Sequence, residues 1–199
     1  MNFILESDDI NDYLKSNKYV DFYDKSIRQK ANQLFDLMTD EKEKIKAAYE
    51  YVRDEIKHSG DIGSEKMTKS ASEVLKYKEG ICLAKSHLLA AILRYGGIPA
   101  GFCYQRLTKG DKPGNGYTTH GLNAVFLSEN KWIRLDARGN KHNVDAQFSI
   151  AEEKIAFPAR TEYGEIDYPT IYAMPHKKII EVMEKYKNYR EYISGITEI

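Results

Sequence analysis

The segment from Cys82 to Tyr95 (CLAKSHLLAAILRY) constrains the fold more than any other part of this 199-residue chain. It has the pattern of an α-helix that is apolar over most of its girth, and the pair Gly96-Gly97 ends it. Its alanines leave room for other backbone to approach closely. A helix of this kind usually lies at the centre of its domain, so we expect the remaining elements to pack around it.

A cysteine occupies the first turn of this helix, after Gly80-Ile81. The first turn has backbone N–H groups without partners inside the helix and carries the positive end of the helix dipole. Both features favour a thiolate, so Cys82 is a candidate nucleophile. The only other cysteine, Cys103, lies in an apolar strand-like run, and we expect it to be an inert core residue.

The spacing of apolar residues predicts helices before this segment and strands after it. The expected helices cover residues 10–14, 27–38, 40–56 and 70–75, with Ser7 as the first cap and capping boxes at Asp40 with Glu43 and Ser70 with Glu73. The expected strands cover residues 98–107, 119–128 and 131–136, and a last helix covers residues 176–193. Helices followed by an antiparallel meander indicate an α+β fold.

Three segments are expected to be irregular. Residues 58–69 are polar and contain glycine, and residues 137–175 contain three prolines. Residues 108–118 hold three glycines and a proline and join two predicted strands beside the expected nucleophile. We therefore expect the loop 108–118 to border a cleft.

A histidine and an aspartate follow the cysteine, each at an end of a predicted strand. His120 begins the strand 119–128, and Asp136 closes the strand 131–136, where aspartate is otherwise unfavourable. Cysteine, histidine and aspartate in such positions are typical of a nucleophile, a base and an orienting acid. The other histidines are expected to lie away from this site: His58, His87, His142 and His176.

This triad requires an irregular turn between the last two strands. A two-residue hairpin at Glu129-Asn130 would place Asn123 opposite Asp136 and send His120 to the other face of the sheet. Asp136 reaches His120 only if the register shifts by one residue. A three-residue loop with Asn130 near the left-handed region, or a bulge, would produce that shift.

The residues from about Tyr49 to Asp136 resemble the transglutaminase-like superfamily, a branch of the papain-fold thiol enzymes. The resemblance rests on the helix AYEYVRDEI, the capped segment SASEVL, the run from Gly80-Ile81-Cys82 to GIPA, the histidine strand and the Trp132…Asp136 strand. It implies a central cysteine-bearing helix packed on an antiparallel sheet. It also implies that Cys82 is the nucleophile, His120 the base and Asp136 the orienting acid.

The resemblance further implies one transglutaminase-like domain over residues 1–199, similar to a minimal bacterial member. Its parts would be a helical N-terminal part (1–57), a catalytic core (70–136) and a C-terminal helix (176–193). The chain departs from the family at several points: Leu122 stands where a tryptophan is common, no aromatic residue follows Cys82, and the upstream tryptophan that donates to the oxyanion in animal transglutaminases is missing. Gln105, on the neighbouring strand, is a candidate for that donor; it can equally be an ordinary strand residue.

The distribution of charged and apolar residues indicates which partners and which cellular compartment to expect. The chain has 30 basic and 30 acidic residues without a long block of one sign, so we expect no nucleic acid and no membrane among its partners. The N-terminal residues are acidic where a signal peptide is basic, and no stretch has the length of a membrane span. We therefore expect a cytoplasmic protein without a structural disulfide.

Together these features predict cysteine-dependent acyl transfer on amide bonds of a protein or peptide. A cysteine protease or amidase is favoured over a cross-linking enzyme, and no cofactor and no metal are expected. Two alternatives stay open. One is a non-catalytic peptide-binding module with the same fold, and the other is acyl transfer from a thioester cofactor, as in arylamine acetyltransferases.

Overall fold

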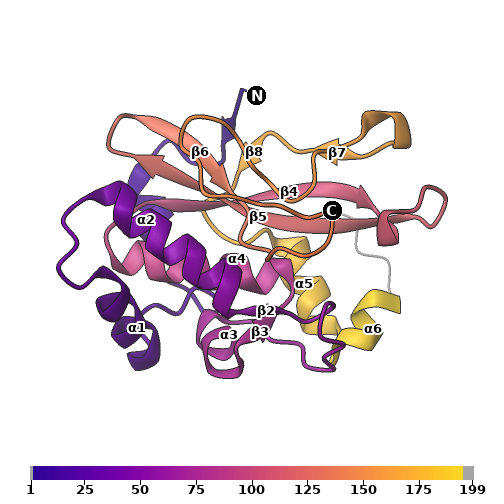
Figure 1. Ribbon diagram of the computed structural model, residues 1–199, viewed down its shortest axis with the longest axis horizontal. Coiled ribbons are helices and arrows are strands. Elements are labelled where there is room, and N and C mark those ends of the chain that lie inside the picture. The colour runs from indigo at the N-terminus through magenta and orange to yellow at the C-terminus, as the bar shows by residue number, and fades with distance from the viewer. Residues whose placement is uncertain (1, 195–199) are drawn as a thin grey trace.

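The central helix of the protein is α4 (Cys82–Tyr95), as its composition predicted. In the computed structural model, which describes residues 2–194, every side chain from Cys82 to Arg94 is buried. Figure 1 shows α4 between the main sheet and the helices α1–α3. The helix ends where Gly97 adopts a φ of 75° and the N–H of Ile98 donates to the carbonyl of Leu93 at 3.0 Å.

The helices that precede α4 begin at residues whose side chains cap them. They are α1 (Lys25–Phe35), α2 (Glu41–Glu50) and α3 (Ala71–Tyr77), capped by Asp24, Asp40 and Ser70. Ser70 and Glu73 form the predicted capping box. The 3₁₀-helix η1 (Ile10–Leu14) is capped by Asp9 rather than by Ser7. A π-helical turn, η2 (Tyr51–Glu55), continues α2 to the end of the predicted helix.

The main sheet is antiparallel, with the strand order β6-β5-β4-β7. Its strands are β4 (Ala100–Thr108), β5 (Tyr117–Leu127), β6 (Lys131–Leu135) and β7 (Ile166–Asp167). Two short parallel pairs join β1 (Ile4–Leu5) to β8 (Thr170–Ile171) and β2 (Lys57–His58) to β3 (Glu79–Gly80). The α-helices lie on one side of the main sheet, so the fold is α+β (Figure 1).

The turn between β5 and β6 has the irregular geometry that the triad required. Leu127 pairs with Lys131, which leaves a three-residue loop, and Asn130 has a φ of 60°. As a result Asn123 lies opposite Leu135 instead of Asp136. The one-residue shift is confirmed, and it directs Asp136 to the face of the sheet that carries His120.

The predicted C-terminal helix is wrong in one respect, because it is broken into α5 (Lys177–Lys185) and α6 (Tyr189–Ser194). The backbone of Tyr186 is extended. The side chain of Asn188 then accepts a hydrogen bond from the N–H of Glu191 at 2.9 Å, which starts a new helix.

Candidate active site

The nucleophile candidate lies at the start of α4, where the helix has no side-chain cap. Ile81 occupies the N-cap position and makes no such bond, so the N–H groups of the first turn are left for other partners. Gly121 of β5 lies against Leu83, and an added Cβ there would be 2.6 Å from a Leu83 methyl carbon. Because glycine permits this approach, Cys82 comes close to the strand that carries His120.

His120 and Asp136 form a buried hydrogen-bonded pair. Nε2 of His120 lies 2.7 Å from Oδ2 of Asp136, and because an ionised carboxylate only accepts, this nitrogen carries the proton. His120 and the Cys82 thiol line the same cleft, and each shifts the pKa of the other. The N–H groups of Arg138 and Ala156 also donate to the Asp136 carboxylate, at 3.1 and 3.0 Å. The structure thus brings the three predicted residues together.

The electrostatics of these three residues favour an ion pair. Burial alone would raise the pKa of Cys82, but His120 and hydrogen bonds from two histidines hold it well below its ordinary value. Burial alone would lower the pKa of His120, but the charges of Asp136 and Cys82 raise it to about 10. The Cys103 thiol, in contrast, has its pKa raised to about 12 by burial. Only Cys82 therefore has the electrostatics of a reactive thiol.

A segment after β6 covers the histidine. The ring of Phe157 meets the ring of His120 edge-on, with centroids 5.2 Å apart and an angle of 86°. Gln105 lies opposite His120 in the sheet, but its amide nitrogen donates to the Phe157 carbonyl at 3.1 Å. The structure therefore gives Gln105 a contact with the covering segment and does not bring it to the thiol. His120 itself is the fourth residue of β5 and not its first, because the strand begins at Tyr117.

A second histidine, which sequence reasoning placed away from the site, lies beside the thiol. His58 ends β2, which pairs with β3 so that His58 is opposite Gly80, two residues before Cys82. His58 lines the same cleft as Cys82, and it contributes to the lowered pKa of the Cys82 thiol. Burial lowers the pKa of His58. The signal that could have pointed to it is the turn sequence HSGD, which returns the chain toward the helix start.

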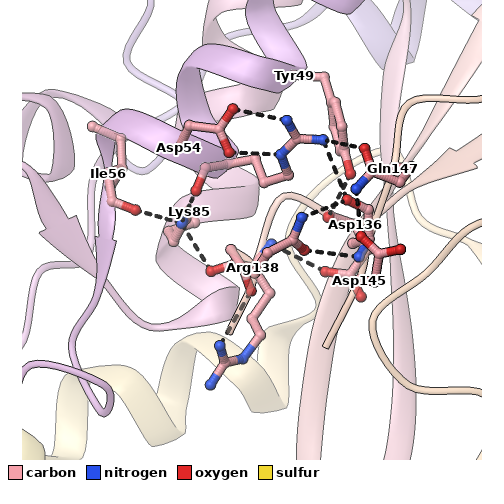
Figure 2. Close-up of polar contacts among 12 residues, drawn as sticks. Tyr49, Asp54, Ile56, Lys85, Asp136, Arg138, Asp145 and Gln147 are labelled. Carbon is pink, nitrogen blue, oxygen red and sulfur yellow. Dashed lines mark hydrogen bonds and ion pairs between the residues drawn. The ribbon is translucent and has the colours of Figure 1, made fainter. Parts of the chain in front are cut away.

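Two buried cations join the elements around the site. The guanidinium of Arg138 forms a bidentate pair with Asp61 at 2.6 and 2.8 Å, which links the turn after His58 to the loop after Asp136. The ammonium of Lys85, one turn along α4, donates to the carbonyls of Ile56 and Arg138 at 2.5 and 2.9 Å (Figure 2). Burial is the main reason that the pKa of Lys85 falls to about 7. Lys85 thus ties the helix of Cys82 to the segments before His58 and after Asp136.

A cleft of about 620 Å³ opens at Cys82, His120 and His58. Residues of the loop 108–118 line one part of it, so the expectation that this loop borders the cleft is confirmed. Tyr189, Tyr192 and Ile193 of α6 also line it. Within residues 2–194 no group of three or more His, Cys, Asp and Glu side chains is arranged to hold a metal ion.

The chain matches the family model of the transglutaminase-like superfamily over residues 28–137, more than half of its length, and it belongs to this superfamily. The matched region contains Cys82 and His120 and ends just after Asp136. Among curated proteins none matches this chain. In the part of the chain from residue 2 to 194, no helix is both long and apolar enough to cross a membrane.

Two solved structures are similar to parts of this chain. A candidate cysteine protease from Cytophaga hutchinsonii has a TM-score of 0.54 and 20% identity, and the alignment covers 66% of this chain and 43% of that one. The periplasmic domain of TgpA from Pseudomonas aeruginosa has a TM-score of 0.49 and 17% identity, with 66% and 48% covered. The chain thus spans less than half the length of either protein. At 20% identity, the first likeness concerns the fold alone.

Proposed function

We propose that this protein transfers acyl groups from amide bonds of a protein or peptide through a thioester on Cys82. The observation that carries the proposal is that Cys82 and His120 line one cleft, with His120 hydrogen-bonded to the buried Asp136 carboxylate. In this reading Cys82 is the nucleophile, His120 the base and Asp136 the group that orients the imidazole.

The reaction begins from a thiolate–imidazolium pair formed when His120 takes the Cys82 proton. The sulfur attacks the amide carbon, and the carbonyl π electrons move onto the oxygen. The N–H of Cys82, in the uncapped first turn of α4, is directed to stabilise this oxyanion. The C–N bond then breaks, the amine takes the His120 proton, and the acyl group stays on sulfur as a thioester.

The thioester is resolved by water in hydrolysis or by an amine in transamidation. We favour hydrolysis, because threonine, histidine and arginine side chains in the lining of this otherwise largely apolar cleft can bind the attacking water. Peptide substrates suit a cleft bordered on one side by the loop 108–118 and on the other by α6. The cytoplasmic location and the single domain over residues 1–199 stay predictions.

An activated ester tests the proposal without knowledge of the natural substrate. Incubation with p-nitrophenyl acetate should place an acetyl group on Cys82, located by peptide mass spectrometry. Cys82→Ala should release no burst of nitrophenol, and His120→Ala should release it far more slowly, whereas the matched variant Cys103→Ala should behave as wild type. An acyl group on Cys103, or an unchanged burst in Cys82→Ala, would contradict the proposed function. Absence of any acyl-enzyme in the wild type would favour the peptide-binding module.

A further inference from the structure

The orientation of the His58 ring is fixed by a backbone N–H. The amide of Gly60 donates to Nδ1 of His58 at 3.2 Å. A nitrogen that accepts from an N–H group cannot itself hold a proton, so the proton of this ring lies on Nε2. The His58 side chain is therefore neutral and presents one donor.

That donor is directed at the nucleophile. The pairing of β2 with β3 holds the His58 backbone opposite Gly80, and the N–H of Ser59 donates to the Gly80 carbonyl at 3.1 Å. His58 and Cys82 line the same cleft, and His58 lowers the pKa of the Cys82 thiol. Because Nδ1 of His58 accepts from Gly60, only its Nε2–H is available to donate into the cleft.

We propose that His58 is a catalytic residue of the acyl transfer, a neutral donor whose Nε2–H binds the Cys82 thiolate and then the oxyanion of the tetrahedral intermediate. The inference rests on the proposed function and extends it, because it assigns the second oxyanion donor beside the backbone N–H of Cys82. No proton is transferred by His58 in this role. It donates the same hydrogen bond to sulfur before attack and to oxygen after it.

The two histidines at the thiol are suited to different tasks. His120 has a carboxylate on its far nitrogen and can carry a positive charge, as a base that becomes an acid must. His58 has an N–H group on its far nitrogen, which opposes a second proton. The carboxylate of Asp61, whose charge acts on His58, is bound by Arg138. His58 therefore stays a donor through the whole cycle.

Gly60 is part of the same arrangement. An added Cβ at Gly60 would lie 3.3 Å from Cε1 of His58 and would overlap the Tyr189 hydroxyl. The turn after β2 is thus closed tightly between the His58 ring and α6. This packing leaves the ring little freedom to turn away from Cys82.

A comparison of two reactions at the same sulfur tests the proposal. Alkylation by iodoacetamide forms no oxyanion, whereas acylation by p-nitrophenyl acetate does. His58→Gln and His58→Met have side chains of similar length, but only glutamine offers an N–H donor. We expect His58→Met to slow acylation about 10²–10³-fold more than it slows alkylation of the thiolate, and His58→Gln to recover a large part of that difference.

The thiolate supplies a second readout. Loss of the donor should raise the pKa obtained from the pH dependence of Cys82 alkylation in His58→Met, and His58→Gln should raise it less. Urea unfolding of both variants establishes that they are folded. If the two reactions slow by the same factor, or if neither slows, His58 has a structural role only and the inference is wrong. Failure of the wild type to form any acyl-enzyme would instead refute the proposed function itself.

Discussion

Substitution of Gly121 by alanine should separate Cys82 from His120, the proposed nucleophile and base. The added Cβ would lie 2.6 Å from a methyl carbon of Leu83 and 3.3 Å from its Cα, whereas carbon atoms prefer a separation of about 3.5–4.0 Å. Leu83 is 1% exposed, so its side chain has no solvent to move into. The overlap must therefore be relieved by displacing the start of α4 from β5.

The expected magnitudes follow from this overlap. Overpacking of a buried site costs about 1–3 kcal/mol of unfolding free energy. A displacement of roughly 1 Å at the reacting groups slows catalysis by about 10²-fold. In a strand without such crowding, glycine to alanine would stabilise the fold by roughly 0.5–1 kcal/mol, so the sign of the effect is informative.

Urea unfolding and acylation by p-nitrophenyl acetate measure both consequences. Leu83→Ala removes the methyl group that the new Cβ meets. Gly121→Ala should therefore lower the free energy of unfolding by less in the Leu83→Ala background than in the wild type. The remaining 3.3 Å contact involves backbone, so the relief should be partial. A Gly121→Ala protein with wild-type stability and wild-type acylation would refute the argument that this glycine brings Cys82 to His120.

Three further variants have definite expected outcomes. Lys85→Met leaves the buried carbonyls of Ile56 and Arg138 without this donor, which costs about 1–3 kcal/mol each and is partly offset by removal of a buried charge. Urea unfolding should therefore show a lower free energy of unfolding, and an unchanged midpoint would contradict this. Asp136→Asn should slow acylation roughly 10²–10⁴-fold. It should also move the alkaline limb of the pH–rate profile to lower pH, because the carboxylate no longer raises the pKa of His120. Cys103→Ala should acylate as wild type and lose about 1 kcal/mol of stability, and a slow Cys103→Ala would assign that thiol a role that its burial opposes.

The proximity of Cys82, His120 and Asp136 could be predicted because the sequence carries local signals for it. The apolar helix 82–95 with a cysteine in its first turn has few alternatives. The sequence left open on which face of the sheet Asp136 lies. The conformation of the turn between the last two strands decides this, because it sets their register. Asn130, which tolerates the left-handed region better than most residues, adopts a φ of 60° there.

His58 and the break in the C-terminal helix show where local signals end. The strands β2 and β3 have two residues each, too short for a period to be read, and only their pairing brings His58 to Cys82. The break was readable in principle, because Asn188 followed by Glu191 has the spacing of a helix start. The continuous apolar face over residues 179–193 obscured it.

The most direct test of the central claim, that Cys82 is a thiolate held by His120, is the pH dependence of alkylation at each cysteine. Iodoacetamide labelling, quantified by peptide mass spectrometry, treats Cys103 as an internal reference. An ordinary thiol with a pKa of about 8.5 is ionised to only about 3 parts in 10⁴ at pH 5. We expect Cys82 to be labelled rapidly at pH 5, Cys103 to stay unlabelled, and His120→Ala to lose the labelling of Cys82 at that pH by more than about 10²-fold. Equal and slow labelling of both cysteines, or a Cys82 profile that His120→Ala leaves unchanged, would contradict the account.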